Sequence, residues 1–74
     1  MGREQVTNRY TVQDDAGRRY TVTQTTVFES GRLIGGGEAP VDVRHELDDG
    51  TRVEPSIDET AFFDHSRGKG YERV

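Results

Sequence analysis

The sequence contains no cysteine, only two prolines and few residues of the kind that build a protein core. Eight Val, two Ile, two Leu and three Phe make 15 such residues among 74. That share, about 20%, lies at the edge below which chains tend to stay disordered. Because a net charge of −4 opposes collapse only weakly, we expect one small folded domain over residues 1–74. Without a disulfide, paired β-structure or self-association has to stabilise its thin core.

Long apolar runs are absent as well. No stretch of about 18 apolar residues could form a transmembrane helix, and residues 1–20 lack the apolar segment of a secretory signal. We therefore expect a cytoplasmic protein without membrane contact. A pI near 5.0 argues against a general nucleic-acid binder, whose affinity comes mainly from phosphate neutralisation.

Four short segments that end in Gly carry the signal of tight turns: 15–17, 29–31, 48–50 and 66–68. The last residue of a three-residue hairpin loop is often left-handed, and Gly avoids the Cβ clash there. Counting outward from three of these turns places apolar side chains opposite each other. The predicted pairs are Tyr10 with Val22, Val12 with Tyr20, His45 with Val53, Val43 with Pro55, Phe63 with Tyr71, and Thr60 near Val74.

The segments between the turns are predicted strands, at about residues 5–13, 18–28 and 41–47. Alternation puts four side chains of the third strand on one face, namely Val41, Val43, His45 and Leu47. Residues 34–39 include three consecutive Gly and are predicted to form a flexible loop.

Residues 57–65 are ambiguous between helix and strand. Ser56 and Glu59 fit a helix-capping box, whereas Thr60, Phe62 and Phe63 favour a strand, which we prefer. The predicted fold class is all-β: a small antiparallel meander of five or six strands. It forms either an SH3-like barrel or a strongly bent sheet, with at most a short helical turn near Ser56.

No set of side chains has the pattern of a catalytic or metal site. There is no Cys, and the three Ser residues lack the Gly-x-Ser-x-Gly context of an activated nucleophile. Turn chemistry explains Asp48 and Asp49, and the acidic residues near His65 lack the spacing of a metal site. His45 is expected to be a neutral core histidine. We predict a protein that is not an enzyme and uses no cofactor or metal.

Two groups of residues are candidates for contact with a partner. The first is Arg32, Leu33 and Ile34, where adjacent aliphatic residues beside the Gly-rich loop could anchor another protein. In the alternative, Leu33 packs opposite Val27. The second group, Arg67, Lys69, Tyr71 and Arg73, is compatible with a stacking platform for single-stranded nucleic acid, or else is a solvated hairpin tip.

Several hairpin segments, Tyr10-Thr11-Val12, Tyr20-Thr21-Val22 and Leu47-Asp48-Asp49-Gly50-Thr51-Arg52-Val53, resemble a group of small uncharacterised bacterial all-β proteins. The resemblance implies a compact cytoplasmic β domain and assigns no activity. The leading functional hypothesis is a small non-enzymatic protein-interaction module with an unknown protein partner. The alternatives are a phage- or mobile-element-type inhibitor that masks a nucleic-acid-binding surface, and a small nucleic-acid-binding β barrel. The chain is expected to be a monomer or a weak homodimer.

Overall fold

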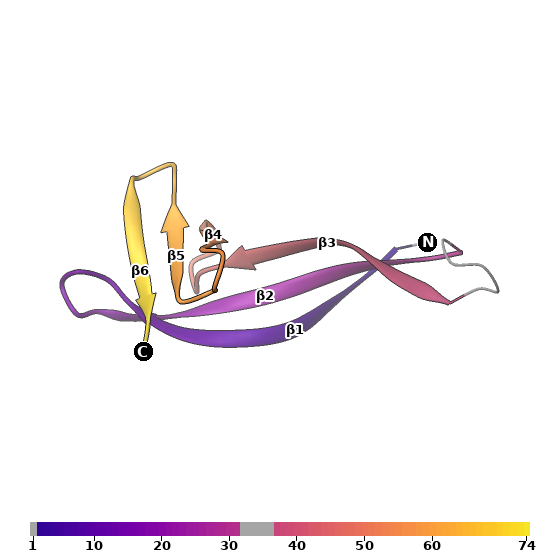
Figure 1. Ribbon diagram of the computed structural model, residues 1–74, viewed down its shortest axis with the longest axis horizontal. Coiled ribbons are helices and arrows are strands. Elements are labelled where there is room, and N and C mark those ends of the chain that lie inside the picture. Colours follow the sequence, from indigo (N-terminus) through magenta and orange to yellow (C-terminus); the bar gives the residue numbers. More distant parts are fainter. Residues whose placement is uncertain (1, 32–36) are drawn as a thin grey trace.

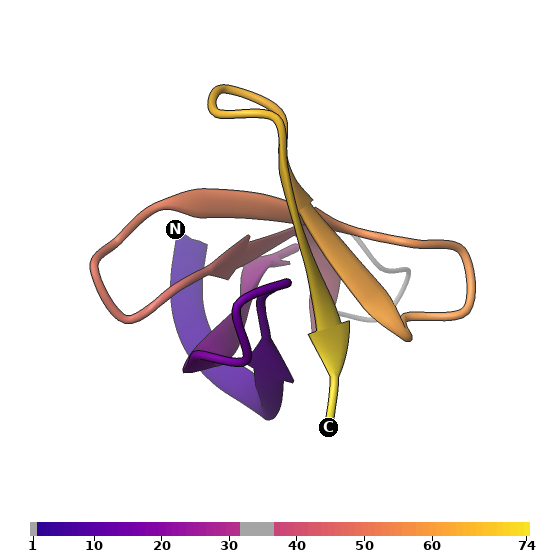
Figure 2. The same cartoon turned by 90° about the vertical axis from the view of Figure 1, so that its left-hand side faces the viewer.

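A computed structural model describes residues 2–31 and 37–74. Within these residues, six antiparallel strands form a closed barrel in chain order (Figures 1 and 2). The strands are β1 (Gly2–Gln13), β2 (Arg19–Ser30), β3 (Glu38–Glu46), β4 (Arg52–Pro55), β5 (Ala61–Asp64) and β6 (Lys69–Arg73). The predicted all-β fold is confirmed, and of the two architectures the chain adopts the barrel. The described residues include no helix with the length and apolar character that a membrane crossing needs.

The first three strands are much longer than the last three, and they extend beyond the barrel as a three-stranded arm (Figure 1). The molecule therefore measures 50 × 23 × 19 Å. β6 pairs with β1 at Val12 and Gln13, and β4 pairs with β3 at His45 and Glu46. Within the arm, which comprises residues 2–8, 24–30 and 38–44, the outer edges of β1 and β3 are consequently free.

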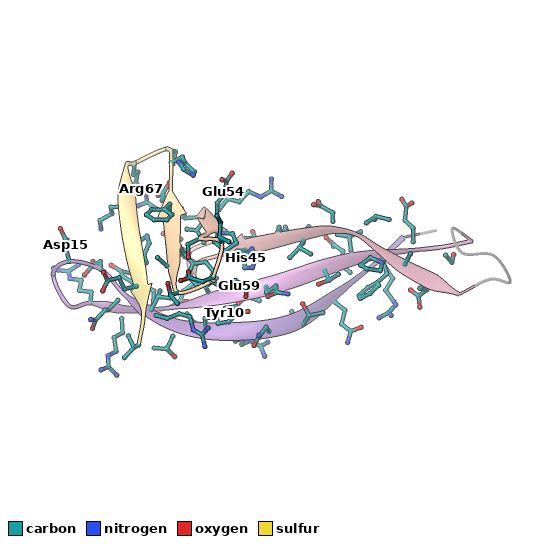
Figure 3. All side chains as sticks on the ribbon, viewed as in Figure 1. Tyr10, Asp15, His45, Glu54, Glu59 and Arg67 are labelled. Atoms are coloured by element: carbon teal, nitrogen blue, oxygen red, sulfur yellow. The ribbon has the colours of Figure 1, made fainter. Side chains whose placement is uncertain are left out.

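The core occupies the closed part of the barrel. Its buried apolar residues are Tyr10, Val12, Val22, Leu47, Val53, Phe62 and Tyr71. Tyr10 and His45 lie toward the end of the barrel from which the arm extends (Figure 3).

The positions of the turns correctly predict the strand register of two of the three hairpins. The pairs Tyr10 with Val22, Val12 with Tyr20, and His45 with Val53 are all confirmed. The glycines that end the three turns have the expected positive φ: 81° at Gly17, 85° at Gly50 and 65° at Gly68.

The predicted inward face of β3 is correct only inside the barrel. His45 and Leu47 are buried, but Val41 and Val43 are 40% and 46% exposed. These two valines lie in the arm, where no second layer packs against the sheet. Val43 pairs with Thr26 on β2, and its predicted pairing with Pro55 is wrong because β3 and β4 separate before that point.

The predicted register of β5 and β6 is wrong by one residue. Tyr71 pairs with Phe62, while Phe63 pairs with Gly70. Asp64 pairs with Lys69, so the loop has four residues, 65–68, instead of three. The Asp64 carboxylate stabilises this longer loop by accepting the backbone N–H of Ser66 at 3.1 Å.

Two further boundaries differ from prediction. Residues 56–60 form a tight turn and no helix, with the Glu59 N–H donating to the Ser56 carbonyl at 3.0 Å; the preferred strand begins at Ala61. The predicted flexible loop includes Glu38 and Ala39, but both belong to β3 and pair with β2. Residues 34–36 of that loop lie outside the described residues.

Candidate functional site

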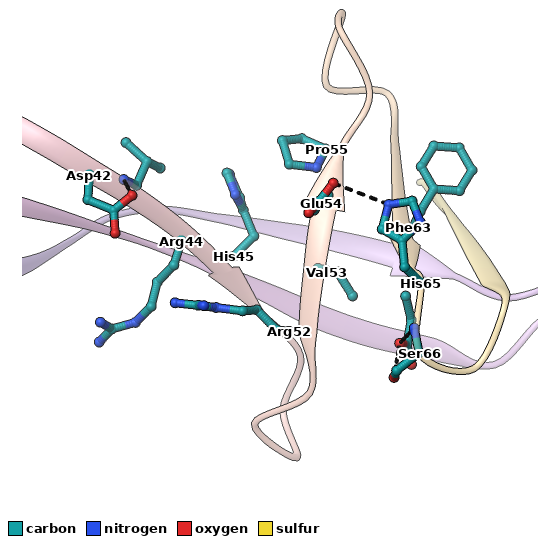
Figure 4. A pocket seen from close by; sticks show the side chains of 12 residues that line it. Asp42, Arg44, His45, Arg52, Val53, Glu54, Pro55, Phe63, His65 and Ser66 are labelled. Atoms are coloured by element: carbon teal, nitrogen blue, oxygen red, sulfur yellow. Dashed lines mark hydrogen bonds and ion pairs between the residues drawn. The ribbon is translucent and has the colours of Figure 1, made fainter.

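A groove opens at the surface where β3 and β4 separate (Figure 4). Beyond the residue pair His45–Val53, β3 continues into the arm, while β4 pairs with β5. The hollow between them has a volume of about 420 Å³. It is lined by residues 42–45 of β3, 52–55 of β4, and 63–66 of β5 and the turn that follows.

Phe63 is the aromatic residue of this groove that faces solvent. Its neighbours Phe62 and Asp64 are 0% and 1% exposed, so alternation along β5 turns Phe63 outward, where it is 44% exposed. Gly70 lies opposite Phe63 on β6, and a Cβ at Gly70 would be only 3.6 Å from the Phe63 ring. Because Gly70 has no side chain, this position of β6 places no side chain against the Phe63 ring.

A second hollow, of about 550 Å³, lies on the side of Phe63 that faces β6. Its lining combines Gln13, Asp14 and Asp15 with Phe63 and residues 68–72. Phe63 therefore borders two surface hollows, a position suited to an aromatic anchor in an interface.

The charged side chains of the groove are mostly engaged. The Asp42 carboxylate accepts the N–H of Val43 at 2.9 Å, and Glu54 Oε2 lies 3.2 Å from Nε2 of His65. Arg44 forms ion pairs with Glu4 and Glu46.

Arg52 is the exception in this set. Within the residues that the structure describes, no carboxylate forms an ion pair with it. In the part of the chain that the structure describes, the groove thus combines the exposed Phe63 ring with one cation, Arg52, that has no ion-pair partner.

The Asp64 carboxylate fixes the turn that carries His65. It accepts hydrogen bonds from the Ser66 hydroxyl at 2.6 Å and from Nε of Arg67 at 2.7 Å. The hydrogen bond from Ser66, assisted by those from Arg67, lowers the pKa of Asp64 to about 2 although burial opposes the shift. The ring of His65 in turn lies 6.4 Å from that of Phe63, measured between centroids.

The four predicted nucleic-acid contacts are used within the fold. Tyr71 is 2% exposed and packs edge-on against Tyr20 at 5.4 Å, which is at odds with stacking on a base. Its predicted companions make internal contacts: Arg67 pairs with Asp64 and Asp49, Lys69 with Asp14, and Arg73 lies over the Tyr10 ring. The structure does not assemble these residues into an open basic platform.

The other predicted contact, Arg32, Leu33 and Ile34, lies outside the described residues. The alternative interpretation, in which Leu33 packs opposite Val27, depends on these same residues; Val27 itself pairs with Glu4 on β1 and Asp42 on β3.

His45 is buried as predicted, at 7% exposed, and packs against the Phe62 ring at a centroid distance of 5.6 Å. Burial lowers its pKa, and the charge of Glu59 opposes this shift. Among the described residues, no three metal-ligating side chains converge.

Phe63, Val43 and Arg52 were not predicted from the sequence to be surface residues. One signal for Phe63 was available: two adjacent Phe residues on a strand cannot both face the core. For the other two, the separation of β3 from β4 had to be known. No protein family, curated protein or solved structure matches this chain, so the resemblance to small bacterial β proteins stays a prediction.

Proposed function

We propose that this chain is a non-enzymatic protein-interaction module of the cytoplasm that contacts its partner through the groove beside Phe63. The observation that supports this role is the exposed Phe63 ring between two hollows. Aromatic and Arg side chains are enriched in protein interfaces, and a few of them carry most of the binding energy. Phe63 and Arg52 are residues of these two types in one groove.

The charges of the groove favour a particular partner surface. Asp42, Glu54 and Asp64 already have partners, whereas Arg52 has none among the described residues. A complementary partner therefore brings an apolar side chain to Phe63 and a carboxylate to Arg52.

Contact through side chains is favoured over the addition of a strand to β3. Pro40 has no N–H to donate, and Val41 is skipped in the pairing with β2 as a bulge. The next exposed donor, the N–H of Val43, is already bonded to Asp42. Proline, bulges and charged residues are devices that protect sheet edges from pairing.

The free edge of β1 carries related protection. The register shifts at Thr7, and the Asn8 side-chain oxygen accepts the N–H of Arg9 at 2.9 Å. Both protected edges support a monomer that presents a side-chain surface.

Affinity capture from a lysate of the native host tests the proposal. Wild-type protein and Ile57→Ala, which removes an exposed apolar side chain outside the groove lining, should retain the same protein. Phe63→Ala should lose it, with at least a tenfold weaker Kd in a direct titration, which is about 1.4 kcal/mol. Arg52→Glu should weaken binding as well.

Equal retention by Phe63→Ala would place the interface elsewhere. Retention of nucleic acid in place of protein, with affinity that falls steeply as salt rises, would favour the nucleic-acid-binding alternative.

A further inference from the structure

A second cluster of polar side chains lies where the arm meets the barrel, and it contains a buried histidine nitrogen without a partner. His45 is more than nine-tenths buried, and its Nε2 atom has no hydrogen-bond partner among the described residues. Buried polar atoms are normally paired, so such an atom calls for an explanation. Tyr10, His45 and Glu59 are grouped in this region (Figure 3).

Glu59, whose charge acts on this histidine, is held in an unusual conformation. Its φ of 58° is left-handed, which is uncommon for a residue other than Gly. Its carboxylate accepts the hydroxyl of Tyr10 at 2.8 Å, and this hydrogen bond raises the pKa of Tyr10. The contact holds the turn formed by residues 56–60 against β1.

Tyr10 has a second acceptor within reach. The amide oxygen of Gln24 lies 3.1 Å from the hydroxyl, which also accepts a hydrogen bond from Asn8 at 2.9 Å. A phenol has a single proton to donate. Tyr10 can therefore give up Glu59 and remain fully hydrogen-bonded by donating to Gln24.

Glu59 likewise has two prospective partners. Its negative charge acts on His45 and favours the protonated imidazole. While His45 is neutral, the carboxylate bonds to Tyr10. Once His45 takes up a proton from solvent, a charged N–H becomes a stronger donor than the neutral phenol.

We propose that Tyr10 and His45 compete for the Glu59 carboxylate, so that protonation of His45 transfers Glu59 from Tyr10 to His45 and shifts the turn at residues 56–60. The transfer breaks the Tyr10–Glu59 hydrogen bond, forms a His45–Glu59 ion pair and redirects the Tyr10 proton to Gln24. This competition takes place in the free protein and does not depend on a partner at the groove.

The other groups around His45 agree with this assignment. Gln24 of β2 and Val53 of β4 lie opposite it and carry no charge, and the Phe62 ring of β5 packs on it. The cation of β6, Arg73, lies over the Tyr10 ring at 4.8 Å, where its charge acts on Tyr10. Glu59 is therefore the carboxylate that is placed to form an ion pair with a protonated His45.

An NMR pH titration of the free protein tests the competition. The imidazole of His45, the ring of Tyr10 and the amide of Glu59 should all shift with one midpoint, which lies below the ordinary histidine value of about 6.5. His65→Gln serves as the matched control and should leave this midpoint unchanged, whereas His45→Gln should abolish the shifts of Tyr10 and Glu59.

Substitutions of Glu59 and of Tyr10 should shift the titration midpoint of His45 in opposite directions. A merely structural role of these two residues would not produce opposite shifts. Glu59→Gln removes the carboxylate and should move the His45 midpoint further down. Tyr10→Phe removes the competitor and should move it up. Titration of His45 without any response at Tyr10 and Glu59, or midpoint shifts of the same sign in both variants, would overturn the proposal even if His45→Gln does not fold.

Discussion

Phe62 and Phe63 are adjacent and chemically identical, yet the structure gives them opposite roles, and this difference can be measured as stability. Phe62 is fully buried, with ring centroids of Tyr10 and His45 at 5.3 and 5.6 Å. Truncating such a ring to Ala typically costs about 3 to 5 kcal/mol, because a cavity is added to the lost burial. A chain of this length has roughly 4 to 11 kcal/mol of total stability, so Phe62→Ala should be largely or wholly unfolded.

Leucine substitutions keep the comparison within a measurable range. Phe62→Leu should lower the free energy of unfolding by about 1 to 2 kcal/mol, whereas Phe63→Leu should change it by about 0.5 kcal/mol or less. Urea unfolding followed by tyrosine fluorescence suits the chain, which has three Tyr and no Trp. Equal m-values would show that both variants unfold from the same compact state. A larger loss for Phe63→Leu would refute the observed register and support pairing of Phe63 with Tyr71.

Three other outcomes follow from the turns and the edges. Gly50 has a φ of 85°, so Gly50→Val should lower the free energy of unfolding by more than about 1 kcal/mol in urea titrations, while Gly2→Ala should be nearly neutral in the same measurement. The native pKa of Asp64 is about 2, against an ordinary value of 3.8. The ionised carboxylate therefore contributes its full share of the free energy of unfolding above pH 3.8, and this share is lost as the pH falls toward 2. Asp64→Asn should remove that part of the acid dependence. Because Pro40 and Asp42 protect the β3 edge, sedimentation across about a hundredfold range of concentration should show a constant 8.3 kDa species, and a mass that rises with concentration would contradict this edge protection.

The parts of the fold that the sequence predicts well are those decided by neighbouring residues. A Gly that ends a turn fixes where the chain reverses, and alternation then fixes which side chains face each other. This is why the pairing of Tyr10 with Val22 and of His45 with Val53 could be predicted. The strands themselves follow from runs of β-branched and aromatic residues, as in residues 19–28.

The last hairpin shows where local reasoning fails. A Gly at the end of the turn is equally compatible with three or four loop residues, and both Phe62 and Phe63 satisfy an apolar pattern. Asp64 determines which loop length forms. Its carboxylate accepts hydrogen bonds from the backbone N–H groups of Ser66 and Arg67, so the turn begins one residue earlier than predicted. Such a contact could have been proposed from the tendency of Asp to bond to the backbone two residues on.

The candidate groove was beyond prediction for a different reason. Alternation states on which side of a strand a residue lies, but burial requires a second layer on that side. Val43 continues the inward face of His45, and only the departure of β3 from β4 turns it from a core residue into a surface residue. Phe63 faces outward because it alternates with the buried Phe62, and its partner on β6 is Gly70, a pairing that exists only in the four-residue register. The groove is thus produced by strand length and by one step of register, and for this reason Val43 and Phe63 look in the sequence like ordinary residues of the core.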